Sequence, residues 1–110
     1  MGAETIDIVV VDVKAVNRGY RVGSLLGSYV YNEDDDEVGT LEDLVVDHDH
    51  PDKVSFAVLE IGGFLGLGAK RVAIEFNALE LEEDSDEIRI VLPGANKKNL
   101  DKLPDYSETS

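Results

Sequence analysis

The feature that most limits the possible folds of this chain is a series of short apolar stretches with strand-type alternation. Each stretch is rich in β-branched or aromatic residues, and alternation places one set of side chains on one face of a strand. Polar turns of hairpin length separate most of the stretches, which favours antiparallel neighbours. The expected strands cover residues 5–13, 28–31, 38–47, 54–61, 71–76 and 88–92.

Helical spacing is confined to the end of the chain. Asn96 can cap a short helix that runs through Leu103 and ends before Pro104. Residues 80–87 are expected to form an acidic turn. We therefore predict a mainly β protein, a small β-barrel or sandwich of about six short, mostly antiparallel strands with a short C-terminal helix.

The length of 110 residues fits one domain. We expect residues 1–18 to hold an N-terminal strand and a connector, residues 19–106 to form the barrel, and residues 107–110 to be a disordered tail. The strand at 54–61 is apolar on both faces, so it is expected to be buried on both sides or to lie at an interface. Phe56 belongs to one of these two faces.

The charge of the chain excludes several classes of partner. There are 24 acidic and 10 basic residues, and the net charge is −14. A nucleic acid would need a basic surface, and anionic membranes are disfavoured for the same reason. No apolar run is long enough for membrane insertion. The lack of cysteine excludes thiolate chemistry. The compartment stays open: a soluble protein, either cytoplasmic or, if a signal peptide has been removed, periplasmic.

A glycine-rich loop at residues 62–70 invites comparison with nucleotide-binding loops. It lacks the Gly-Lys-Ser/Thr sequence of a phosphate-binding loop, and the residues after it alternate as a strand instead of starting a helix. We therefore expect a structural loop and no cofactor. Its large apolar residues Phe64, Leu65 and Leu67 are predicted to contact a protein partner, which includes a second copy in a homodimer. The alternative is that they fold back and plug one end of the barrel.

Ten acids and no base lie within residues 32–52, in two polar turns. His48, Asp49 and His50 are candidate metal ligands there, although a solvated hairpin gives the same pattern. The acids lack the spacing of an EF-hand loop. Both histidines share one turn and no nucleophile-elbow sequence is present, so we predict no catalytic residues and no enzyme.

Three segments together resemble the PRC-barrel domain family, which includes the cytoplasmic barrel of the photosynthetic reaction-centre H subunit and the C-terminal domain of a ribosome maturation factor. They are SLLGSYVY at 24–31, EVGTLEDLVVD at 37–47 and GGFLGLGAKRVAI at 62–74. The resemblance covers about residues 19–106, as in a stand-alone member. It implies a small barrel that joins assemblies, with no shared catalytic residue. We therefore predict a non-enzymatic protein-interaction or assembly module. The alternative is a small-ligand or metal-binding domain that uses the acidic turns.

Overall fold

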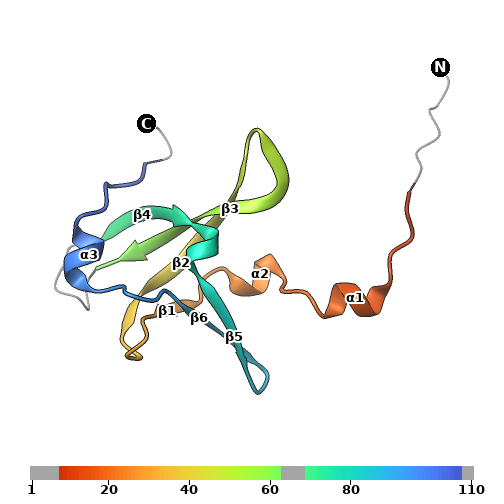
Figure 1. Cartoon of the computed structure of the whole chain (residues 1–110), viewed down its shortest axis with the longest axis horizontal. Helices are drawn as coiled ribbons and strands as arrows, with labels where there is room; N and C mark the ends of the chain where they lie inside the picture. Colours follow the sequence, from red (N-terminus) through yellow and green to blue (C-terminus); the bar gives the residue numbers. More distant parts are fainter. Residues whose placement is uncertain (1–7, 63–68, 108–110) are drawn as a thin grey trace.

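The computed structural model describes residues 8–62 and 69–107 (Figure 1). As predicted, this part of the chain is mainly β. The strands are β1 (Tyr29–Tyr31), β2 (Glu37–Asp47), β3 (His50–Ile61), β4 (Lys70–Glu75), β5 (Glu80–Asp84) and β6 (Glu87–Val91). Short helices are α1 (Val13–Asn17), α2 (Val22–Leu25) and α3 (Lys97–Asp101), and a 3₁₀ turn, η1, covers Phe76–Ala78.

The strands form one mixed sheet in the order β4-β3-β2-β1-β6-β5. All neighbouring pairs are antiparallel except β1 and β6, which run parallel through Val30 opposite Ile90 and Tyr31 opposite Val91. β4 and β5 are the two edges, and in the described residues no strand pairing joins them. The sheet is therefore barrel-like in its curvature but is not closed by hydrogen bonds (Figure 1).

Every strand contributes to one hydrophobic cluster. β1 supplies Val30 and β6 supplies Ile90, and both side chains are fully buried. α2 adds Leu25 and α3 adds Leu100. Buried members from the other strands and loops are Val38, Leu41, Ala57, Leu59, Ile61, Val72, Leu79 and Ala95. Burial of these side chains is the main favourable term that holds the curved sheet together.

Two β-bulges in β2 change which of its side chains face the core. Glu42 is extra between the pairs Leu41–Leu59 and Asp43–Val58, and Val38 is extra where β2 leaves β1. Leu41 and Leu44 are three residues apart, so strict alternation would place them on opposite faces. Because the bulge at Glu42 shifts the alternation by one, Leu44 also packs against the core.

Gly39 lies where β2 and β3 approach most closely. A Cβ atom at this position would lie 2.6 Å from the backbone oxygen of Glu60 and 3.0 Å from Cγ2 of Ile61. A glycine inside a strand pattern is typical of a bulge or bend. The bulge is at its neighbour Val38, and the glycine itself is required by the close approach of the β3 backbone.

Asn32 is the one buried polar residue among those the structure describes, and its side chain organises the turn after β1. Its amide nitrogen donates to the backbone oxygen of Ala95 at 2.9 Å and to Oδ2 of Asp36 at 3.3 Å. Its Oδ1 accepts from the backbone nitrogens of Asp34 and Asp36, both at 2.9 Å. The side chain thus ties residues 32–36 to the loop before α3.

The first expected strand is wrong in its described part. Residues 8–12 are in no strand, and α1 begins at Val13 with Asp12 as its N-cap, whose carboxylate accepts from the backbone nitrogen of Lys14 at 3.0 Å. A stretch of β-branched residues becomes a strand only when a neighbouring strand accepts its backbone hydrogen bonds. The sheet offers no such neighbour to these residues within the described chain.

Two further expectations need correction. Residues 80–87 were expected to be a turn, but they form β5 and the start of β6 around a short turn at residues 85–86. Phe56 is 40% exposed, so β3 is buried on both faces only from Ala57 to Leu59. Phe56 points away from the face of Ala57 because side chains alternate, and it lies near the end of the sheet. The C-terminal helix is confirmed, with Asn96 as its N-cap.

Replacing Gly39 by alanine should destabilise the protein by about 3 kcal/mol, because the new methyl group meets backbone and not a flexible side chain. Gly23→Ala is the matched control: nothing lies within 4 Å of a Cβ there. Since Gly23 is inside α2, alanine should raise stability by about 0.5–1 kcal/mol. Urea unfolding of both variants measures the difference, and equal stabilities would contradict the close approach.

Asn32→Ala should cost about 3 kcal/mol, since it leaves the Ala95 carbonyl and two backbone N–H groups without their partner. Asp34→Ala is the control, because it keeps the backbone N–H that bonds Asn32 and removes only an exposed carboxylate. We expect its unfolding free energy to lie within about 0.5 kcal/mol of the wild type. A mild effect of Asn32→Ala would mean that the turn is not held by this side chain.

Candidate functional site

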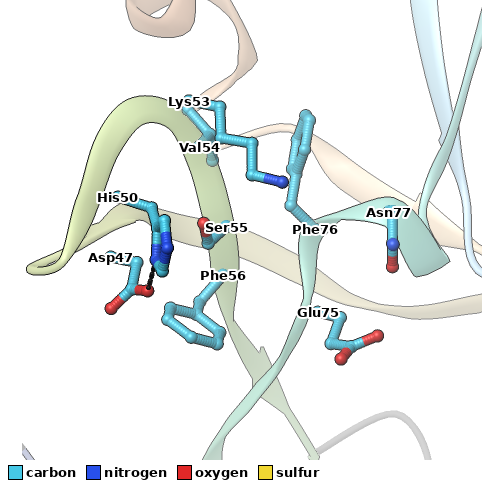
Figure 2. Close-up of a pocket in the computed structure, with 9 residues that line it drawn as sticks. All are labelled: Asp47, His50, Lys53, Val54, Ser55, Phe56, Glu75, Phe76 and Asn77. Carbon is cyan, nitrogen blue, oxygen red and sulfur yellow. Dashed lines mark hydrogen bonds and ion pairs between the residues drawn. The ribbon is translucent and has the colours of Figure 1, made fainter.

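A shallow groove lies where the β2–β3 hairpin passes the end of β4 (Figure 2). Its volume is about 400 Å³. The half-exposed rings of Phe56 and Phe76 are its large apolar elements, Val54 adds a smaller apolar side chain, and the remaining lining is polar or charged. The lining residues are Asp47, His50, Lys53, Val54, Ser55, Phe56, Glu75, Phe76 and Asn77.

The polar groups of this groove do not form a catalytic arrangement. Nδ1 of His50 lies 2.9 Å from Oδ2 of Asp47, and the His50 side chain is 71% exposed (Figure 2). Among the described residues, no hydrogen bond joins the Ser55 hydroxyl to His50. A nucleophile activated by a neighbouring base is therefore not assembled here.

The predicted metal ligands do not converge either. His48 pairs with its neighbour Asp49, Nδ1 to Oδ1 at 3.1 Å, while His50 pairs separately with Asp47. The His48 side chain is 98% exposed. Across residues 8–62 and 69–107 no group of three or more potential ligands is close enough to hold an ion. The arrangement supports the solvated hairpin that the sequence offered as the other interpretation.

The first acidic turn is more ordered than a solvated run of charges. Asp35 adopts a left-handed backbone with φ of 65° and forms an ion pair with Arg89, whose guanidinium also lies 4.4 Å from the centre of the Tyr31 ring. Asp36 accepts a hydrogen bond from the Asn32 amide. The carboxylate of Asp34 has no partner among the described residues. Asp35 and Asp36 therefore have partners of their own at this turn.

Glu33 connects the same turn to the loop before α3. Its Oε1 accepts a hydrogen bond from the backbone nitrogen of Gly94 at 2.9 Å. Hydrogen bonds from its own backbone and from that of Gly94 hold the pKa of Glu33 below its usual value of 4.5. The Glu33 carboxylate is fully exposed, so its hydrogen bond to Gly94 orders the loop only locally.

The most apolar exposed segment is one that the sequence assigned to an N-terminal strand. Ile8, Val9, Val10 and Val11 are 82%, 80%, 92% and 62% exposed. We call these four residues the apolar arm. Val13 and Val16 in α1 continue the exposed apolar surface, and α1 has no buried residue. In Figure 1 the arm and α1 extend away from the sheet.

Sequence reasoning recognised the β-branched composition of this segment but not its isolation. The signal that could have revealed it is the lack of alternation from residue 8 to residue 11, because all four positions are apolar. A strand that covers one face of a core would show polar residues at every second position. A segment that is apolar on both sides requires cover on both sides.

The interaction residues predicted from the glycine loop, Phe64, Leu65 and Leu67, lie outside the described residues. Nearby, the C-terminal segment lies along the β4 edge. The backbone nitrogen of Tyr106 donates to the oxygen of Arg71 at 2.8 Å. Nζ of Lys70 donates to the oxygen of Asp101 at 3.1 Å and lies 3.6 Å from Oδ1 of Asp105. One edge of the sheet is therefore partly covered.

Comparison with known families gives a match to the PRC-barrel domain over residues 17–97. The match takes in all six strands and begins at the last residue of α1, so it leaves the apolar arm outside. Comparison with curated proteins finds no match. In the described residues, no helix has both the length and the apolar character needed to span a membrane.

Titration of Glu33 followed by NMR should give a pKa below 4.5, and the amide proton of Gly94 should shift with the same midpoint. Because the folded pKa is the lower one, the contribution of Glu33 to stability is present above pH 4.5 and is lost as the pH falls through the folded pKa. A Gly94 amide that does not respond would contradict the hydrogen bond.

Proposed function

Because this chain belongs to the PRC-barrel domain family, we propose that it is a non-enzymatic protein-interaction module. The observation that carries the proposal is the apolar arm, with four consecutive large aliphatic side chains between 62% and 92% exposed. Burial of one such side chain contributes about 1.5–3 kcal/mol. Contiguous exposed apolar surface of this kind is typical of a docking segment.

The surroundings of the arm favour a protein partner. With a net charge of −14, this chain repels nucleic acid and anionic lipid. A protein surface can offer both an apolar face and backbone hydrogen-bond groups to an extended apolar segment. The groove at the β2–β3 hairpin supplies less support for a small ligand, because it is shallow and open to solvent.

The predicted contact through Phe64, Leu65 and Leu67 stays part of this proposal. Glycines on both sides of these residues leave them without local cover in the sequence. A homodimer that uses them would bury the same patch from each copy. The arm and the loop are two candidate contacts of one module, and they can be separated by substitution.

The proposal predicts that the immobilised protein captures a protein partner, either another copy or a different chain. Val9→Asp with Val10→Asp should reduce capture about tenfold or more, because a buried carboxylate without a partner is strongly unfavourable. Val46→Asp is the matched control, since Val46 is 48% exposed on β2. Phe64→Asp tests the loop in the same way, and an unfolded variant would indicate the plug.

Calorimetric titration with Ca²⁺ and Zn²⁺ tests the ligand-binding alternative on the same samples. We expect no saturable heat for either ion. A saturable signal that disappears in His48→Ala with His50→Ala would favour a metal-binding domain. Failure to capture any partner, together with a monomeric purified protein, would contradict the interaction module.

A further inference from the structure

We propose that the apolar arm of one copy adds as a strand to the open β5 edge of a second copy, in a reciprocal dimer. This inference rests on the proposed function and names its partner. It joins two features that stay unpaired in the described part of one chain. One is a β-branched segment that belongs to no sheet, and the other is a sheet edge with no strand beside it.

The β5 edge has free backbone groups at defined positions. The backbone nitrogen of Leu92 donates to the backbone oxygen of Tyr31 in β1. Backbone groups of successive strand residues point to opposite sides, so those of Ile90, like those of Leu92, point toward β1. The backbone N–H and C=O groups of Arg89 and Val91 therefore point toward β5. Glu82 and Glu80 lie opposite Arg89 and Val91, so their backbone N–H and C=O groups bond to β6 within the hairpin. The groups of Leu81 and Glu83 therefore point to the open side. A free edge of this kind accepts an extended segment by β-augmentation.

The other edge is less suited to the arm. β4 already receives the backbone nitrogen of Tyr106 at Arg71, and Lys70 contacts Asp101 and Asp105. Within the described residues, no strand pairs with the outer side of β5. The choice between the two edges thus favours β5.

Charges around the arm and around β5 are complementary. Residues 13–32 hold three cations, Lys14, Arg18 and Arg21, and no acid. None of the three forms an ion pair with a described residue. Residues 80–87 hold six acids, and the exposed carboxylates of Glu82, Glu83 and Glu87 are likewise without a described cation partner. An arm paired with β5 would bring Lys14, three residues after its end, toward this acidic edge.

The position of α1 favours a second copy over the chain's own edge. α1 lies between the arm and the barrel, is capped by Asp12, and directs residues 8–11 away from the sheet (Figure 1). The radius of gyration is 17.2 Å, against about 13 Å for a compact domain of this length. The arm is outside the segment that matches the family, so the dimer would be an addition to the barrel and not a property of the common fold.

Light scattering on the purified full chain, over about a hundredfold range of concentration near physiological salt, tests the proposal. The wild type and Val46→Asp should form dimers. Val9→Asp with Val10→Asp should be folded and should weaken the dimer about 100-fold, because alternation places one new carboxylate on the apolar face of the sheet without a partner and the other beside the acids of β5. A monomeric wild type at every concentration would overturn the inference. Capture of a different protein through the arm would then leave the proposed function standing.

Glu83→Pro tests the edge itself. Proline removes an N–H that faces outward in the single chain, so the fold should tolerate it, whereas the arm would lose a donor and meet the ring. We expect a folded monomer. If this variant does not fold, hydrogen exchange of the wild type decides: the amides of Leu81 and Glu83, and every second amide of residues 8–11, should be protected in the dimer and exchange quickly on dilution. A dimer with unprotected amides at these positions would refute strand addition.

Discussion

The parallel contact between β1 and β6 is the interaction on which the rest of the structure depends. On one side of it lies the antiparallel unit β2–β3–β4, and on the other the β5–β6 hairpin. Each is built from local pairing, and a lone hairpin is marginal in water. Val30 and Ile90 are fully buried opposite each other, and the Leu92 nitrogen donates to the Tyr31 oxygen at 2.7 Å. Among the described strand pairings, this is the one that joins the two halves around a common core.

The turn that follows the junction shows how an acidic chain keeps a defined shape. Asn32 satisfies backbone groups on both sides of the junction from a buried position, while the carboxylates around it stay exposed. Exposed ion pairs such as Asp35 with Arg89 contribute about 0–1 kcal/mol, so the neutral amide is the more important of the two interactions. The acidic side chains therefore lie at the surface of this barrel, whereas the hydrogen bonds of Asn32 hold the backbone of residues 32–36 against the loop before α3.

The open sheet is the feature of this PRC-barrel that the proposed contact uses. An unclosed sheet retains two edges, and each edge carries backbone groups that water or another strand must satisfy. The C-terminal segment covers part of β4, and acidic side chains surround β5. Such acids discourage pairing with arbitrary strands, whereas a segment followed by unpaired cations meets a complementary surface. In the proposed dimer, the arm and the edge would combine an apolar contact with electrostatic selection.

The sequence by itself determined the strands at β1, β2, β3, β4 and β6, the cap at Asn96 and the family, because alternation, turns and capping are local and can be read residue by residue. It could not find β5, whose acids look like a turn and whose strand geometry comes from pairing with β6. The separation of His48 from His50 and the bulge at Glu42 also follow from the register of two strands. Tertiary structure alone decided that residues 8–11 have no sheet to join and that Phe56 lies outside the core. Strand propensity is local, whereas a strand exists only where distant residues supply its hydrogen bonds and its cover.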